Sequence, residues 1–306
     1  MSPQLLAYAA LASVCFFWGT TYLAIRMALE SFPPLLLVAA RFVTSGALML
    51  AVVRWRGARL PRGRELAIAC LAGVLILGAG NGALVFAELR IPSGLAGLFI
   101  TISPFWMVGL EALLPGGDRL HLPTIFGMLV GLAGAALLVA PDVFGQSPGA
   151  SVLHGFLILQ GGMASWSFGS ILQRRQNVSA HPIVVGAVHQ LAAGLAFTPL
   201  ALVAQESTIQ WSIRGVSAIL YLVVFGSILG YSSYIYALDR LPVAMVSIHP
   251  YINSVVAVAL GWLFYREPFG RREAFAMAVI FTGVALVRKF QAARQAAPVE
   301  SEVLDA

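Results

Sequence analysis

Long apolar runs separated by short polar connections make up almost the whole chain. A transmembrane helix needs about 20 mostly apolar residues, and ten runs of that kind follow one another. They cover residues 5–27, 33–53, 65–87, 93–113, 121–140, 151–172, 182–203, 213–236, 243–264 and 270–290. The pattern predicts an all-α membrane protein with ten transmembrane helices. It is followed by a polar tail, 291–306, that we expect to be disordered and cytoplasmic.

The composition supports a membrane location and argues against other classes of protein. Of the 306 residues, 59% are hydrophobic and 10% charged, whereas a soluble domain has about 45–50% and about 25%. The lipid bilayer is therefore the expected partner of the excess apolar surface. The net charge of +6 does not indicate a nucleic-acid partner, because the basic residues lie in short loops rather than on one soluble face. Cys15 and Cys70 lie inside apolar runs without zinc-site spacing, so we predict no metal and no cofactor.

The distribution of basic residues in the loops predicts the orientation of the chain. Ten helices return the chain to its starting side, so both termini lie on one face. With the N-terminus inside, the cytoplasmic loops and tail hold Arg54, Arg56, Arg59, Arg62, Arg64, Arg119, Arg174, Arg175, Arg240, Arg288, Lys289 and Arg294. The outside then holds Arg26, Arg90, Arg214, Arg266, Arg271 and Arg272. The excess of basic residues inside predicts an N-in/C-in protein of the cell inner membrane. The loop before the last helix does not follow this rule, because it places three arginines outside.

Residues that recur at a nearly constant distance indicate an internal duplication. Trp18, Arg26, Gly78 and Gly82 match Trp166, Arg174, Gly226 and Gly230, each 148 residues later. Ala87, Arg90, Pro92 and Ile102 match Ala237, Arg240, Pro242 and Ile252 at a distance of 150, and Gly134 matches Gly283. We therefore expect two repeats, 1–145 and 146–290. Because five helices are an odd number, the second repeat is inverted, an architecture of secondary transporters with the binding site near the midplane.

Four stretches resemble a known family. WGTTYLAIRMAL (18–29), ARF (40–42), GNGALVFAELRIPSGLAGL (80–98) and ALDRLPVAMVSIHPYINSVVAVALGWLFYREPF (237–269) are similar to EamA-type transporters of the drug/metabolite transporter superfamily, the first half being most similar to the YedA-like branch. The resemblance implies ten helices in two repeats and, mostly, export of metabolites, amino acids or drugs. Relatives often have proline where this chain has Ser254. Pro250 lies four residues earlier, which shifts the expected helix break by about one turn.

Arg41 is the most unusual single residue. It lies about eight residues, or roughly 12 Å, into the second helix, where a charge costs about 2.5–3.5 kcal/mol on insertion scales. One hypothesis is that its guanidinium binds a substrate carboxylate or another anion. The alternative is a structural ion pair with Glu30 or Glu88, both expected near the same outer end of the bundle.

The aromatic residues of the first helix in each repeat are further candidates for substrate binding. Trp18 and Trp166 lie well inside their spans rather than at a membrane interface, so with Tyr22 they either line a central cavity or pack in the core. Such rings suit aromatic or apolar solutes and can stabilise a cation. Asn81, among glycines that are expected to serve helix packing, is also predicted to face the cavity.

Two helices contain proline beside polar residues, which favours a substrate site at the repeat interface. Proline frees a backbone carbonyl one turn earlier. In the fourth helix Thr101 and Ser103 accompany Pro104, and in the ninth His249, Tyr251 and Asn253 surround Pro250. The alternative is a kink with its polar groups bonded to neighbouring helices.

The sequence allows more than one driving force for transport and more than one class of substrate. Glu88, Glu111, His189 and His249 are the candidates for proton coupling, with His249 favoured because histidine titrates nearest neutrality, and passive efflux is equally open. The sequence has no HExxH, no paired mid-membrane aspartates and no GxSxG, so we expect no enzyme and no catalytic residue. An exporter of amino acids or related amphipathic solutes is favoured over a multidrug or cation efflux carrier. The small-molecule substrate is the second expected partner, and a homodimer is left open.

Overall fold

The computed structural model describes residues 2–116, 120–144, 151–176, 180–204, 208–241, 243–246 and 248–295. Every regular element in these residues is helical, so the predicted all-α class is confirmed. The first half contains α1 (Pro3–Leu29), α2 (Pro34–Trp55), α3 (Gly63–Gly73), η1 (Val74–Asn81), α4 (Gly82–Glu88), α5 (Ser93–Ile100), α6 (Ser103–Leu113) and α7 (Leu122–Val143). The second half contains α8 (Ser151–Arg175), α9 (Pro182–Val203), α10 (Ile213–Tyr221), η2 (Leu222–Leu229), α11 (Gly230–Arg240), α12 (Val243–Val246), α13 (His249–Tyr265) and α14 (Arg271–Gln295).

Among the described residues, seven helical stretches are long and apolar enough to cross a membrane. They are Pro3–Leu29, Pro34–Trp55, Gly63–Glu88, Ser93–Leu113, Leu122–Pro141, Pro182–Val203 and Ile213–Leu238. The chain is therefore a multi-pass membrane protein, while the count of ten spans stays a prediction. The start of the predicted disordered tail is wrong: α14 continues to Gln295, because the Ala, Arg and Gln residues that follow the tenth run are good helix formers. Residues 296–306 lie outside the described residues.

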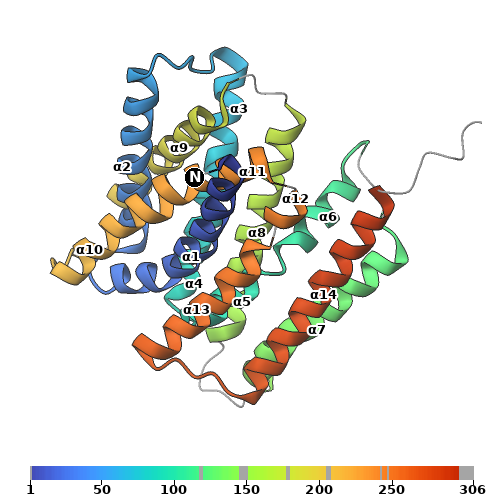
Figure 1. Ribbon diagram of the computed structural model, residues 1–306. Helices are drawn as coiled ribbons and strands as arrows, with labels where there is room; N and C mark the ends of the chain where they lie inside the picture. Colours follow the sequence, from blue (N-terminus) through green and yellow to red (C-terminus); the bar gives the residue numbers. More distant parts are fainter. Residues whose placement is uncertain are drawn as a thin grey trace, which may run out of the picture.

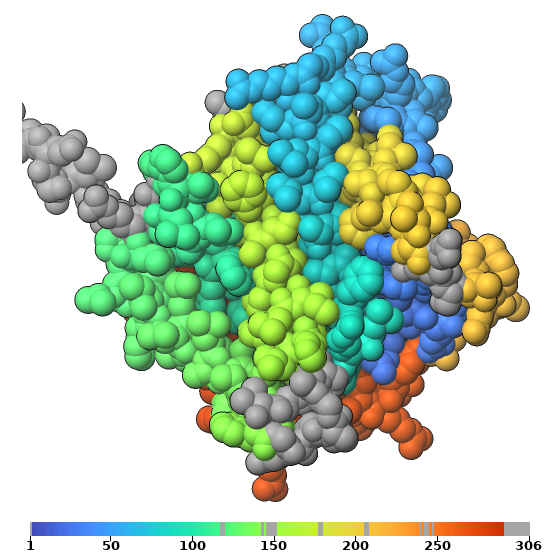
Figure 2. All heavy atoms as spheres, turned by 180° about the vertical axis from the view of Figure 1, so that it is seen from behind, coloured from blue at the N-terminus to red at the C-terminus, as the bar shows by residue number. Residues whose placement is uncertain are grey.

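The helices of the two halves pack against one another rather than within their own half. α2 lies on α9 and α7 lies on α14, as Figure 1 shows. α1 packs on α13 and on α10, η2 and α11, whereas α8 packs on α5 and α6 and on α3, η1 and α4. Figure 2 shows α8, in yellow-green, running beside α3 on the opposite face. Each half thus supplies its first helix to the third and fourth helical regions of the other half.

Reciprocal glycine contacts mark the crossing of α2 and α9. A Cβ atom on Gly46 would collide with the main chain of Leu191, and a Cβ atom on Gly194 would collide with the main chain of Val43. Leu191 and Gly194 follow Val43 and Gly46 by the same 148 residues. Small residues allow two helix backbones to approach this closely. At this crossing the two halves therefore contact each other through matched residues.

The α7–α14 pair repeats this arrangement. Gly134 faces the main chain of Ile280, and Gly283 faces the main chain of Gly131. Ile280 and Gly283 follow Gly131 and Gly134 by 149 residues. The two π-helical segments obey the same rule, since η2 begins and ends 148 residues after η1. Helices that correspond in sequence thus also correspond in local backbone geometry.

The broken helices match at a slightly different distance. α6 begins at Ser103 after the N-cap Ile102, and α13 begins at His249 after the N-cap Ile248. The proline occupies the first turn in both helices, where it costs little. The break before α13 therefore lies 146 residues after the break before α6, about one turn earlier than the 150-residue match of Ile102 with Ile252 would place it, as the position of Pro250 led us to expect.

Candidate functional site

Trp18 on α1 is held by the π-helical segment η2. Its indole Nε1 donates a hydrogen bond to the carbonyl oxygen of Gly226, at 3.0 Å. The ring lies against Gly230, where a Cβ atom would collide with Nε1. π-helical turns are uncommon and often occur at functional sites. The two glycines that the duplication pointed to therefore form the surface on which this indole lies.

Arg41 on α2 reaches the same segment from the other side. It is buried, and its Nε donates to the hydroxyl of Ser227 at 3.0 Å. Gly226 leaves room for the guanidinium, because a Cβ atom there would lie 3.1 Å from Nη2. Within the described residues no acidic side chain pairs with Arg41. The alternative of a structural ion pair with Glu30 or Glu88 is therefore wrong: Glu30 binds Arg214, and Glu88 has no hydrogen-bond partner in that same part of the chain.

Three aromatic rings meet beside the guanidinium site. The ring of Trp18 lies 5.2 Å from that of His249, edge to face, and 5.3 Å from that of Tyr234. Tyr234 and His249 are themselves 5.6 Å apart at nearly right angles. These are the separations that aromatic pairs prefer. The rings come from α1, α11 and α13, so the group joins both halves of the chain.

Asn253 fixes the position of His249. With the amide oriented to suit its neighbours, Nδ2 donates to the carbonyl oxygens of His249, at 2.9 Å, and Cys15, at 2.7 Å. Oδ1 then accepts from His249 Nδ1 at 3.2 Å. This arrangement assigns the Nδ1–H tautomer and leaves Nε2 as an acceptor. We call the group of Trp18, Arg41, Gly226, Ser227, Tyr234, His249 and Asn253 the Trp18 cluster.

The structure places the other predicted site residues away from this cluster. Tyr22 is buried in the hydrophobic core. Thr101 is buried and donates to the carbonyl oxygen of Leu98 in its own helix. Tyr251 packs edge to face on Phe281 of α14, because two helical residues turn it about 200° from His249. These three side chains serve packing in this conformation.

The remaining candidates lie on the corresponding surface of the other half. Trp166 on α8 packs against Gly80, whose Cβ atom would lie 2.9 Å from the indole ring. Asn81 ends η1 and Ser103 begins α6, and both are half-buried. Sequence reasoning missed Ser227 and Tyr234. The shift of 148 residues could have indicated Ser227, since it matches Gly78 and Gly82, which flank the candidate Asn81, with Gly226 and Gly230.

Ion pairs close both ends of the bundle. At the end where α1 stops, Arg26 lies 3.3 Å from Glu267, which also accepts from the N–H and hydroxyl of Ser93 and from the N–H of Gly94. At the other end, Glu111 accepts from Arg174 and Arg175. Arg26 and Arg174 are the matched pair of the duplication. Each joins the first helix of one half to the fourth helical region of the other.

The free volume differs between these two ends. A cavity of about 360 Å³ lies between α1 and α11, bordered by Ser13, Ser232, Ser233 and Tyr236. Ser13 is five residues, or about 7.5 Å along the helix, from Trp18. Around Glu267 the free volume is only about 10 Å³, too little for more than about one water molecule. Neither space is bordered by a residue of the Trp18 cluster.

Comparison with known proteins gives a consistent result. The model of the EamA-like transporter family matches residues 5–140 and again 153–289. The chain is 33% identical to the uncharacterized inner membrane transporter YedA of Escherichia coli over 299 residues, 97% of this chain and 95% of that protein. It is 27% identical to a probable terminal-alkyne amino-acid exporter of Streptantibioticus cattleyicolor, covering 80% of this chain and 82% of that one. A solved structure described only as "Crystal structure of protein" is 23% identical with a TM-score of 0.64, covers 95% of this chain and 98% of its own, and has the same fold.

Proposed function

The chain belongs to the EamA-like transporter family, and we propose that it exports amino acids or related amphipathic solutes across the inner membrane by alternating access. It is a multi-pass membrane transporter rather than an enzyme. We further propose ten spans in two inverted repeats, 1–145 and 146–290, with both termini in the cytoplasm. The reciprocal crossings at Gly46 and Gly194 and the equal spacing of η1 and η2 support the inversion.

The buried guanidinium of Arg41 is the observation that carries the choice of substrate. Its recorded side-chain partner, Ser227, is neutral, so the charge lacks a counter-ion in the part of the chain that the structure describes. A carboxylate would supply that counter-ion in the bidentate geometry that guanidinium favours. The neighbouring rings of Trp18, Tyr234 and His249 can hold an apolar side chain, and their faces attract an ammonium group. An amino acid carries all of these groups.

The two end clusters support an alternating cycle. In the proposed orientation Arg26 and Glu267 lie on the outer side, and Arg174 and Glu111 lie on the inner side. Each pair joins the halves where they must separate for a solute to leave. The cavity between α1 and α11 then lies toward the inner side, and the small space around Glu267 lies toward the outer side.

The function is tested by transport assays. Cells that overproduce the protein are first screened for resistance to toxic amino-acid analogues and to amphipathic cations, and the solute found is then measured in proteoliposomes. Arg41→Ala should strongly lower the flux of an amino acid, whereas His189→Ala, at the matched position of α9, should retain it. Equal flux in both variants would exclude Arg41 as the carboxylate site. Absence of flux in the wild-type protein for every solute would reject the exporter.

The inverted arrangement is tested by labelling single cysteines in a background where Cys15 and Cys70 are replaced by alanine. Arg62→Cys and His181→Cys should react only from the cytoplasm, and Arg90→Cys and Thr208→Cys only from outside. All four native side chains are exposed in the structure. Reaction of the cysteines at 62 and 181 from opposite sides would contradict the inversion.

Efflux of amphipathic cations is the second candidate, and the aromatic rings of the Trp18 cluster are the observation that favours it. A cation would use the ring faces of Trp18 and Tyr234 without a carboxylate. Arg41→Ala then removes a repulsive charge and should preserve or raise cation efflux. The same variant thus separates the two substrate classes by opposite effects.

A further inference from the structure

Glu88, the last residue of α4, is a buried acid that the proposed transport site does not use. Its side chain is 5% exposed, and neither carboxyl oxygen has a hydrogen-bond partner in the described part of the chain. Buried carboxylates are normally paired or hydrogen-bonded, and one that lacks partners avoids the cost of desolvation by taking up a proton. Glu267 lies in the same region but accepts three hydrogen bonds and an ion pair. The two acids therefore differ in how a charge on them is stabilised.

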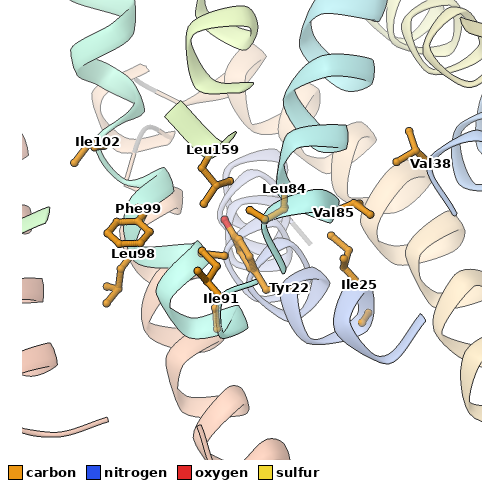
Figure 3. Packing of buried hydrophobic residues seen from close by; sticks show 14 of the residues in the cluster. Tyr22, Ile25, Val38, Leu84, Val85, Ile91, Leu98, Phe99, Ile102 and Leu159 are labelled. Atoms are coloured by element: carbon orange, nitrogen blue, oxygen red, sulfur yellow. The ribbon is translucent and has the colours of Figure 1, made fainter. Parts of the chain in front are cut away.

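The ionisable groups that act on Glu88 come from two elements. α1 supplies Tyr22 and Arg26, and the loop after α13 supplies Glu267. Figure 3 shows Tyr22 lying among Leu84, Ile91 and Leu159, which keep this region apolar.

The other charged or titratable side chains on helices packed against α4 are engaged elsewhere or exposed, and the thiol of Cys15 on α1 lies in a separate hydrophobic cluster. Arg41 on α2 donates to Ser227, and Arg174 and Arg175 on α8 bind Glu111. Arg54 on α2, Tyr8 on α1 and His154 on α8 are exposed. Arg26 is thus the cation that both acids can share.

We propose that Glu88 is the proton-binding site of this transporter and that its proton controls the outer ion pair. With the proton on Glu88, Arg26 binds Glu267 and ties α1 to the capped start of α5, as in the structure. When the proton leaves, the Glu88 carboxylate competes for Arg26, and the link between α1 and Glu267 weakens. This inference rests on the proposed alternating cycle.

Binding and release of this proton on opposite sides of the membrane drive the cycle toward export of the solute. In the outward-facing state the solute has left, and a proton from outside binds a Glu88 oxygen and forms a neutral carboxyl group. Arg26 keeps its own proton, returns to Glu267 and closes the outer end. In the inward-facing state the proton leaves to the cytoplasm before the next solute departs. One proton moves inward for each solute exported, and no covalent bond other than O–H is made or broken.

The proton site is tested without any substrate. Difference infrared spectroscopy of the purified protein across a pH jump should record the carbonyl stretch of a protonated carboxyl group that disappears at high pH. Glu88→Gln and Glu88→Met should both lack this band, whereas Glu111→Gln should keep it, because Glu111 is ion-paired. Gel filtration and thermal unfolding establish that the variants are folded. The proposal is overturned if the band persists in both Glu88 variants or is absent from the wild-type protein.

Coupling is tested with the solute found by the transport screen. With one proton exchanged per solute, a gradient of one pH unit should sustain about a tenfold concentration ratio of solute in proteoliposomes. Glu88→Gln should reach a ratio of about one, because its uncharged side chain neither exchanges a proton nor competes for Arg26, and His154→Ala should behave as the wild type. Flux in the wild type that ignores the pH gradient would overturn the proton site and leave the exporter intact. No flux at all in the wild type would instead reject the exporter.

Discussion

The Trp18 cluster and the region that corresponds to it in the other half share a backbone but not a chemistry. Arg41 corresponds to His189, 148 residues later, and Ser227 corresponds to Ala79, 148 residues earlier. By the same distance Tyr234 corresponds to Phe86. Almost every polar group of the cluster thus has an apolar or uncharged counterpart. The two halves thus place corresponding residues in two similar surroundings, and only one of these has the polar side chains of the Trp18 cluster.

The two tryptophans illustrate the difference most directly. Trp18 lies against Gly230 and hydrogen-bonds to Gly226. In the other half the corresponding glycines, Gly82 and Gly78, face the ring of Phe197 instead. Trp166 is displaced onto Gly80. The two halves thus share a backbone arrangement, whereas their side chains differ. We expect solute to bind at the Trp18 cluster rather than midway between it and the corresponding region.

The largest expected effect is a loss of stability from substitutions at the crossing of α2 and α9, which joins the two halves. Gly46→Ala and Gly194→Ala each force a methyl group into main-chain atoms that cannot rotate away. Both should destabilise the protein by about 3 kcal/mol or more, the upper end of overpacking costs. Thermal unfolding in detergent measures this. Gly161→Ala, where a Cβ atom meets nothing within 4 Å, is the control and should be neutral or stabilising. A large loss of stability for only one of the two variants, Gly46→Ala or Gly194→Ala, would show that the two contacts of the crossing are not equivalent.

The second largest effect separates the two halves. Arg41→Ala should lower amino-acid transport by about 10- to 150-fold, because hydrogen bonds to charged groups contribute about 1.5–3 kcal/mol. His189→Ala should change transport less than about twofold, although it empties an equally buried position. The Nε2 atom of His189 has no partner within the described residues, so little is lost. Initial rates in proteoliposomes decide the point. A stronger loss from His189→Ala would place the solute site around His189 rather than at the Trp18 cluster.

A smaller effect isolates one hydrogen bond. Trp18→Phe keeps an aromatic ring but removes the donor to Gly226. Transport should fall by about two- to tenfold, since a neutral hydrogen bond contributes about 0.5–1.5 kcal/mol. Trp166→Phe, which keeps the ring against Gly80, should have no measurable effect. Concentration dependence of the initial rate gives the apparent affinity for each variant. Equal losses would mean that both tryptophans act on the solute.

The smallest effect concerns the ion pairs at the two ends. The side chain of Arg174 is 65% exposed, and exposed pairs contribute about 0–1 kcal/mol. Arg174→Ala should therefore shift the unfolding temperature little. Arg26→Ala should shift it more, because Glu267 is 6% exposed and loses its cation. Unfolding scans at low and high salt check both statements. Salt should weaken the Arg174 pair more than the Arg26 pair.

The sequence predicted the helices well and the contacts between them poorly. Runs of apolar residues fix where a helix lies, so helices lie in every predicted segment. The partner of Arg41 could not be predicted, because Ser227 is 186 residues away and depends on the π-helical turn of η2. That His249 and Asn253 lie beside Trp18 was not predicted, because the contact joins α1 to α13 across more than 200 residues. Their i, i+4 spacing puts them on one face, which excludes Tyr251.

The glycine crossings of α2 with α9 and of α7 with α14 have a mechanical consequence. At both places main chain touches main chain, with no side chain between to slide or reorient. In the proposed cycle, these two crossings are the fixed points about which one half rotates relative to the other. Rocking that spreads the helices at one membrane face compresses them at the opposite face. In the proposed cycle the two faces therefore do not open together, and we expect no continuous path for ions through the carrier.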